Sequence, residues 1–258
     1  MITNNDLHFS QYKLNSYIGQ DNLLARSIVR YTSLKNLHSM LKGNLYTTRR
    51  KNFDDKREQG IVKQTKNAFR LQFADGFNKE YWKQFDEKVK HSRELLTSCW
   101  STSIIEDALM WKSFNAEVRI KTTTKKLLDA ISDPDINIII CDQVKYAPES
   151  PIYTLRDALF YKELSYRNEQ EIRFYFDKGL NGNQEISISP NNLIDEVLIS
   201  PFINNKAQVL LKNIKEEFAY LSLRESMIIE KWQQVPRENK FYKLLLAAKR
   251  LWEYFKYP

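Results

Sequence analysis

Two short segments of the sequence carry side chains suited to chemistry on a sugar. One is "CWSTS", residues 99–103, and the other is "NEQE", which contains Glu169 and Glu171. Alternate residues of an extended strand face the same side, so Ser101 and Ser103 would share one face, and the two glutamates would lie about 7 Å apart at the backbone. A carboxylate beside a sugar stabilises the positive charge that develops at the anomeric carbon as a glycosidic bond breaks. The glutamate pair therefore predicts a site for glycosidic cleavage.

Each segment also has an ordinary structural explanation. Hydroxyl side chains such as those of residues 99–103 are typical of a solvent-facing strand end. Glu169 and Glu171 would be tolerated on a solvated edge strand, where Arg167 and Arg173 could neutralise them. Local sequence leaves both interpretations open, and a functional site requires that the two segments meet.

A third charged residue ends an apolar run near the N-terminus. Arg30 follows "SIV" and precedes Tyr31 on the first expected strand. A guanidinium at a strand end is most often exposed, but its planar fork of donors also matches a pyrophosphate, which a lysine ammonium cannot bind in the same way. Arg30 is therefore a candidate for binding a ligand that carries phosphate.

The order of these three elements along the chain resembles the R-S-E class of ADP-ribosyltransferases. That class shows an early Arg, a central Ser-Thr-Ser strand and a later Glu-x-Glu strand, which correspond here to Arg30, residues 101–103 and residues 169–171. The resemblance implies that NAD is the substrate and that Glu171 is catalytic while Glu169 orients the acceptor; from the residues themselves we expect no metal to take part. The residues that it implies for NAD binding are Arg30, Tyr31, Ser101, Thr102 and Ser103.

A wider resemblance covers most of the chain. The segments that carry it, in order, are "RYTSLKNLHSMLKGNLYTTRRKNFDDKRE", "CWSTSIIEDALMWKSF", "VKY", "FYKELSYRNEQEIRF" and "LIDEVLIS". Together they are similar to the bacterial domain-of-unknown-function family numbered 2971. The sequence departs from that family's pattern at Asp54-Asp55, where Asn-Asp is usual, and at "SYRNE", where a Trp often stands. The family's name implies no activity, so the transferase prediction rests on the R-S-E resemblance.

The elements that must position these residues alternate between strand and helix. Strands are expected at 28–31, 44–48, 99–103, 137–146, 168–176, 184–190 and 194–200, and helices at 34–41, 54–73, 78–96, 106–114, 155–164, 206–221 and 241–255. Gly43 follows the first of these helices, where a left-handed residue would end it. This pattern predicts an α+β fold with a small mixed or antiparallel sheet and flanking helices, similar to the ADP-ribosyltransferases. We expect one catalytic domain over residues 1–258, with a helical insertion at 54–97 and a C-terminal docking helix at 237–258.

The formal charge of +8 is concentrated in two segments. Residues 42–70 hold nine Lys and Arg against three Asp and Glu, and residues 237–258 hold six against two. Such asymmetry favours an anionic partner. The alternative function is therefore a non-catalytic domain that binds nucleic acid, and a transferase could itself modify either a protein arginine or a nucleic acid, as an intracellular toxin or an anti-phage effector would.

Other site classes lack their residues in this sequence. None of the six glycines forms a dinucleotide-binding or P-loop motif, and Cys99, Cys141 and the three histidines fit no metal spacing. The first residues lack the pattern of a signal peptide and no apolar run is long enough for a membrane span, so we expect a cytoplasmic protein. Trp111 is expected in the core. The acidic box of Asp54, Asp55 and Glu58 fits the first turn of a helix or, alternatively, a substrate contact.

Overall fold

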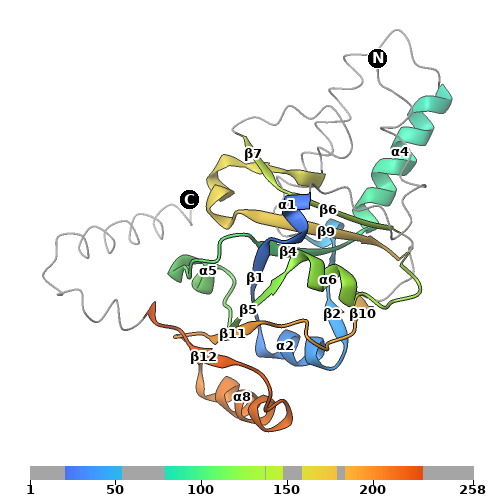
Figure 1. The fold of residues 1–258 in the computed structure, drawn as a ribbon. Helices are drawn as coiled ribbons and strands as arrows, with labels where there is room; N and C mark the ends of the chain where they lie inside the picture. The colour runs from blue at the N-terminus through green and yellow to red at the C-terminus, as the bar shows by residue number, and fades with distance from the viewer. Residues whose placement is uncertain (1–20, 54–78, 137, 148–158, 179–183, 229–258) are drawn as a thin grey trace, which may run out of the picture.

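The computed structural model describes residues 21–53, 79–136, 138–147, 159–178 and 184–228 (Figure 1). Within them an eight-stranded, mostly antiparallel sheet runs in the order β12-β11-β5-β1-β4-β9-β6, and β3 pairs with β4. Its strands are β1 (Ser27–Thr32), β3 (Thr48–Arg49), β4 (Leu96–Ser101), β5 (Val118–Thr123), β6 (Ile138–Gln143), β9 (Glu171–Asp177), β11 (Glu196–Ile199) and β12 (Leu223–Glu225). The predicted combination of helices with an antiparallel sheet is confirmed. The sheet is larger than the small one expected, because β5 and β12 extend it.

Two small sheets and several helices complete the described structure. Strand β2 (Asn44–Tyr46) pairs with β10 (Glu185–Ser187), and β7 (Lys145–Ala147) pairs with β8 (Tyr161–Glu163). The helices are α1 (Asp21–Leu24), α2 (Leu34–Leu41), α4 (Lys79–Glu94), α5 (Ala108–Ser113), α6 (Thr124–Ala130) and α8 (Asn205–Glu217), with 3-10 turns η3 (Arg50–Asn52) and η4 (Leu164–Glu169). No helix in these ranges is apolar over a length that would cross a membrane.

Helix α2 begins and ends where its sequence predicts. The Ser33 hydroxyl accepts the N–H of Asn36, which satisfies one free donor of the first turn. Gly43 ends the turn with φ +91°, and a Cβ there would approach the carbonyl oxygen of Ile188 to 3.1 Å. A residue with a side chain would therefore strain the connection that leads α2 into β2.

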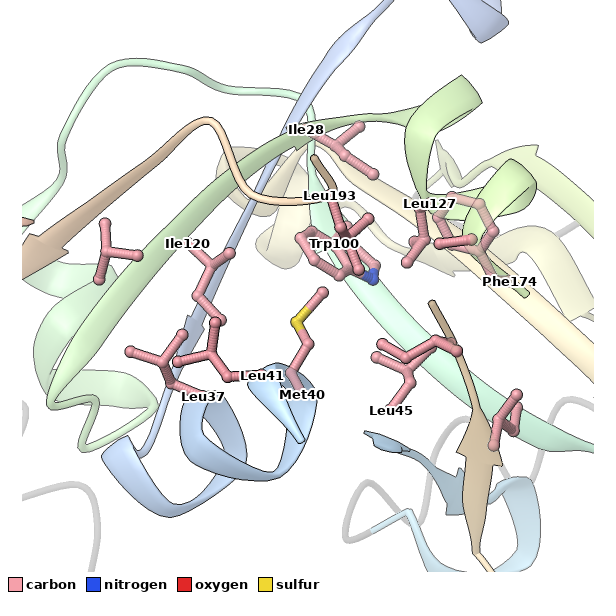
Figure 2. Packing of buried hydrophobic residues seen from close by; sticks show 14 of the residues in the cluster. Ile28, Leu37, Met40, Leu41, Leu45, Trp100, Ile120, Leu127, Phe174 and Leu193 are labelled. Atoms are coloured by element: carbon pink, nitrogen blue, oxygen red, sulfur yellow. The ribbon is translucent and has the colours of Figure 1, made fainter. Parts of the chain in front are cut away.

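One face of the large sheet carries the main hydrophobic core (Figure 2). Ile28, Trp100, Ile120 and Phe174 alternate onto this face from four strands and pack against apolar residues of α2, α6 and α8. Each large side chain buried there contributes about 1.5–3 kcal/mol. The opposite face holds a smaller cluster around Val29, Tyr31 and Trp111, so the prediction that Trp111 lies in the core is confirmed.

Two segments differ from the elements expected for them. Residues 137–146, expected as one strand, divide into β6 and β7, which belong to different sheets. Residues 155–164 are expected as one helix, of which 155–158 lie outside the described residues and 159–160 are helical; the helix does not continue through Tyr161–Glu163, which forms β8 by pairing in parallel with Lys145–Ala147. Pairing with a distant strand here outweighs the helical spacing of the apolar residues.

The predicted insertion and tail are described only in part. Helix α4 confirms the helix expected at 78–96. The helix ends at Glu94, because Leu96–Ser101 forms β4. The first helix of the insertion, the acidic box at 54, 55 and 58 and the C-terminal helix at 237–258 lie outside the described residues.

Candidate active site

A cavity of about 420 Å³ lies where β1 and β4 diverge. The two strands pair at Val29 with Ser101, whereas farther along the same edge β4 pairs with β3, at Thr97 with Thr48. Most of the strand residues that line the cavity, among them Tyr31, Ser101 and Glu171, alternate onto the sheet face that does not carry the main core. The cavity's lining includes Val29, Arg30, Tyr31, Thr48, Phe53, Cys99, Trp100, Ser101, Met110, Phe114, Lys162, Glu169, Glu171 and Arg173.

Ser101 and Glu171 face each other across neighbouring strands. They are direct partners in the antiparallel pairing of β4 with β9, so their side chains share a face, and both line the cavity. The Ser101 hydroxyl oxygen accepts the backbone N–H of Ser103 at 3.1 Å. The predicted meeting of the Ser-Thr-Ser and Glu-x-Glu segments is confirmed.

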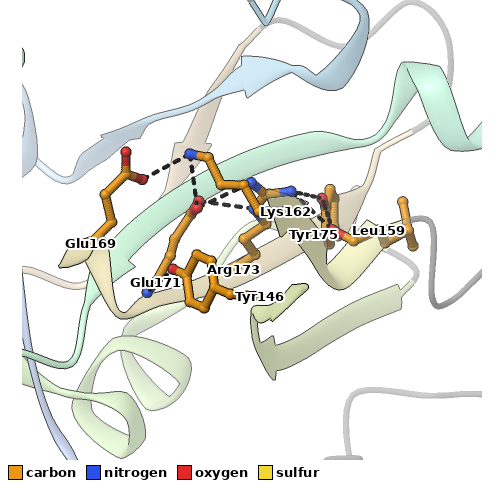
Figure 3. A network of polar contacts seen from close by, with 7 residues as sticks. All are labelled: Tyr146, Leu159, Lys162, Glu169, Glu171, Arg173 and Tyr175. Atoms are coloured by element: carbon orange, nitrogen blue, oxygen red, sulfur yellow. Dashed lines mark hydrogen bonds and ion pairs between the residues drawn. The ribbon is translucent and has the colours of Figure 1, made fainter. Parts of the chain in front are cut away.

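Glu171 forms a buried ion pair (Figure 3). Its Oε1 accepts a hydrogen bond from Nε of Arg173 at 2.8 Å, and its Oε2 accepts one from Nη2 of Arg173 at 3.0 Å. The ammonium of Lys162 lies 3.5 Å from Oε2. Burial would raise the pKa of Glu171, but the charge and hydrogen bonds of Arg173, with help from Lys162 and Cys99, lower that pKa to about 2. Glu171 is only 5% exposed on a strand that is paired on both sides. The alternative of a solvated edge strand is therefore wrong for Glu171.

Glu169 reaches the site by a different route from the one predicted. It ends the 3-10 turn η4, and Gln170 has a left-handed backbone with φ 43°, so the two glutamates are not neighbours on one extended strand. Lys162 brings their carboxylates together instead, because its ammonium lies 2.8 Å from Oε2 of Glu169 as well as near Glu171. Burial raises the pKa of Glu169 despite the opposing charge of Lys162.

Arg30 lines the cavity as predicted, but its guanidinium lies on the other side of the sheet from Glu171. Nη1 donates to Oγ of Ser98 at 3.1 Å and to the carbonyl of Tyr46 at 3.2 Å, and the guanidinium carbon lies 5.8 Å from the centre of the Trp100 ring. The alternation along β1 accounts for this, since Arg30 is paired with Ile120 on the core face.

Tyr31 stands on the cavity face next to Arg30. Its phenolic oxygen accepts the N–H of Asp107 at 3.1 Å, and its ring packs edge-on against Trp111 with centroids 4.9 Å apart. Burial raises the pKa of Tyr31. The side chain is therefore a fixed, neutral wall of the cavity.

Thr102 and Ser103 are not among the residues that line the cavity. The backbone N–H and the hydroxyl of Thr102 both donate to the carbonyl of Gln170, at 2.8 and 2.9 Å, and so fasten the ends of β4 and β9 to each other. Ser103 contributes the N–H that Ser101 accepts. In this structure both residues support Ser101 and Glu171 rather than facing the cavity.

Comparisons of the chain with protein-family models, with curated proteins and with solved structures find no match. The resemblance to the R-S-E transferases and to family 2971 therefore stays a prediction.

Sequence reasoning missed three residues that shape the site. Lys162 and Tyr146 come from β8 and β7, and the phenolic oxygen of Tyr146 accepts the backbone N–H of Glu171 at 2.7 Å. Cys99 lines the cavity and hydrogen-bonds the Glu171 carboxylate. Cys99 could have been found, because it lies two residues before Ser101 on the same strand and so shares its face. Nothing local to Lys162 or Tyr146 indicates their place.

In the described part of the first basic segment, three of the four basic side chains contact carboxylates. The Lys42 ammonium contacts Glu217, and Arg49 and Lys51 both contact Glu94. Residues 54–70 of that segment lie outside the described ranges. No cluster of three or more potential metal ligands occurs among the residues that the structure describes.

Proposed function

We propose that this protein is an NAD-dependent ADP-ribosyltransferase with a fold of the ADP-ribosyltransferase type. The observation that carries the proposal is the pairing of Ser101 with Glu171 at the wall of one cavity. Its volume of about 420 Å³ lies within the usual range for small-molecule sites, roughly 300–1,000 Å³. Apolar walls at Phe53, Met110 and Phe114 suit an aromatic ring such as nicotinamide.

The proposed reaction needs one carboxylate that stays ionised. The bond between the nicotinamide nitrogen and the ribose anomeric carbon breaks, and its electron pair leaves with nicotinamide. A nucleophile of the acceptor then bonds to that carbon and loses a proton. Glu171, with its pKa near 2, keeps its negative charge throughout the neutral range and faces the position where positive charge develops.

Glu169 is suited to accept the proton that the acceptor loses. Its side chain is more exposed than that of Glu171, and burial raises its pKa above the usual value of a glutamate. A carboxylate with a raised pKa is a better base than one held at about 2. We assign Glu169 to orienting and deprotonating the acceptor, whose attack completes the transfer.

Arg30 and Tyr31 remain the proposed contacts for the rest of NAD. Arg30 is half-buried, and its guanidinium donates to two neutral oxygens, from Ser98 and Tyr46; a phosphate would be a stronger acceptor for the same donors. Arg30 is among the residues that line the cavity, although its guanidinium lies on the core face of the sheet. Ser101 is assigned to the nicotinamide-ribose end, next to Glu171.

The test follows both products of the reaction. The purified protein is incubated with NAD labelled in its adenosine half and with cell extract, nicotinamide release is measured, and the labelled product is digested separately with protease and with nuclease. We expect Glu171→Gln to lower nicotinamide release by roughly two to four orders of magnitude. Glu169→Gln should abolish transfer while slow hydrolysis of NAD by water continues.

Glu216→Gln, which changes an exposed carboxylate on α8, is the matched control and should turn over like the wild type. The digestion distinguishes a protein acceptor from a nucleic acid. The proposal fails if the wild type releases no nicotinamide with any extract, or if both glutamate variants near the cavity keep full activity. Binding of nucleic acid that weakens with salt and survives Glu171→Gln, with no NAD turnover, would favour the non-catalytic alternative.

A further inference from the structure

Arg173 is among the most deeply buried charged side chains that the structure describes. It lies on β9, between β4 and β6, the last strand at that end of the sheet, and is 1% exposed. A guanidinium loses favourable hydration when it is buried, so its contacts must compensate for that loss. An apolar residue at this position of β9 would avoid the cost. The contacts of Arg173 must therefore explain why an arginine occupies this position.

The contacts of Arg173 hold its guanidinium in one orientation. Nη1 donates to the carbonyl of Leu159 at 3.0 Å, and the ring of Phe53 lies 5.7 Å from the guanidinium carbon. Nε and Nη2 then point in parallel at the two oxygens of Glu171 (Figure 3). Two parallel bonds fix both the position and the rotation of a carboxylate, which a single ammonium contact does not do.

The backbone of Glu171 is fixed independently of its side chain. Its N–H donates to the phenolic oxygen of Tyr146 at 2.7 Å, and its carbonyl accepts the N–H of Val144 at 2.8 Å. The rotation of the side chain is not fixed by these backbone bonds, and restraining it at the moment of reaction would cost conformational entropy. The fork of Arg173 restrains it in advance.

We propose that Arg173 is the positioning residue of the site, which orients the Glu171 carboxylate toward the cavity and keeps it ionised there. This inference rests on the proposed function for its catalytic consequence, but the placement of the carboxylate can be measured without NAD. Arg173 carries the charge opposite to that of Glu171, so it does not add to the negative charge of the site. Its contribution to the reaction is the fixed geometry of the carboxylate. A misplacement of about 1 Å in such a group can reduce a rate about a hundredfold.

Two substitutions of Arg173 separate orientation from ionisation. Arg173→Lys keeps a positive charge but loses the fork, so we expect kcat to fall at least tenfold with little change in KM. Arg173→Met leaves Glu171 buried without its main counter-charge, so its pKa should rise by several units. Turnover should then be lost near neutral pH and return in part as the pH increases.

The deciding readout is the titration of the Glu171 carboxyl, followed by NMR in protein labelled with carbon-13 at glutamate carboxyls and assigned with Glu171→Gln. Lys178→Met is the matched control, because Lys178 is a buried cation paired with Asp133 at the other end of β9. It should lose stability but keep the wild-type titration and pH profile. Circular dichroism on each variant confirms that the measured protein is folded.

A Glu171 titration that is the same in Arg173→Met as in the wild type overturns the inference, as does wild-type kcat in Arg173→Lys. If the wild type shows no NAD turnover, the proposed function fails, and the NMR titration alone then decides whether Arg173 controls Glu171.

Discussion

The two ends of β9 each carry a buried ion pair, and only one of them faces a cavity. At the first end Glu171 pairs with Arg173, and just past the last residue Lys178 pairs with Asp133 at 2.7 Å. All four side chains are 9% exposed or less. Both Glu171 and Asp133 have lowered pKa values, because their bonds to the paired cations and to other donors outweigh burial.

The difference lies in what else each carboxylate does. Asp133 also accepts the backbone N–H groups of Ser187 and Asp135, and Lys178 also donates to the carbonyl of Glu185, so this pair fastens three chain segments together. Glu171 has side chains as its partners and lines a cavity beside Ser101. A buried charge or a shifted pKa is therefore not enough to mark a site. The cavity beside the carboxylate makes the distinction.

The largest effect should come from removing one carboxylate at each end. Glu171→Gln leaves Arg173 buried without its counter-charge and should lower the free energy of unfolding by about 3–5 kcal/mol, in addition to the loss of NAD turnover. Asp133→Asn should cost similar stability by urea unfolding but leave turnover per folded molecule unchanged. Equal loss of turnover in both variants would contradict the comparison.

Removing both members of the cavity pair should separate stability from function. We expect the double variant Glu171→Leu with Arg173→Met to recover most of the stability lost in Glu171→Gln, since replacing a buried ion pair by apolar side chains is often neutral or stabilising by about 1–4 kcal/mol. Its nicotinamide release should stay at background. Thermal and urea unfolding give the first quantity. Turnover in a stable double variant would show that Glu171 has no role in the reaction.

Low pH should weaken the ion pairs at both ends of β9 and so lower the free energy of unfolding. Glu171 should account for a measurable part of that loss. Its pKa is about 2 in the folded protein and 4.5 when unperturbed, so its ion pair gives full stability above about pH 4.5 and loses it as the pH falls toward 2. The loss amounts to about 3 kcal/mol over that window. Urea unfolding as a function of pH should show this slope in the wild type and less of it in the Glu171→Leu, Arg173→Met double variant. An unchanged slope there would contradict the assignment.

Strand alternation predicts the face of the strand on which Ser101 and Glu171 lie, but only the resemblance to the R-S-E transferases led us to expect that the two residues share a site. Ser101 and Glu171 lie on segments with clear extended patterns, and their order along the chain placed them on strands that could neighbour each other. Arg173 follows from the same rule, because it lies two residues after Glu171. These residues depend on local geometry that the sequence expresses directly.

The remaining parts of the site depend on tertiary contacts. The left-handed backbone at Gln170 takes Glu169 out of the strand. Only the folded chain shows that the ammonium of Lys162 contacts both carboxylates. Lys162 lies in a segment whose apolar spacing predicts a helix, yet pairing with β7 makes it a strand. The side of β1 that Arg30 occupies was likewise unpredictable, because it depends on which face carries the core.

The most direct test of the central claim is whether NAD occupies the cavity beside Glu171. Cys99 lines that cavity and is partly exposed, whereas Cys141 is buried, so iodoacetamide should modify Cys99 preferentially, with Cys99→Ser as the control. Mass spectrometry then gives the rate of modification with and without NAD. We predict that saturating NAD slows modification of Cys99 several-fold in the wild type and in Glu169→Gln. A rate that NAD leaves unchanged would contradict the account.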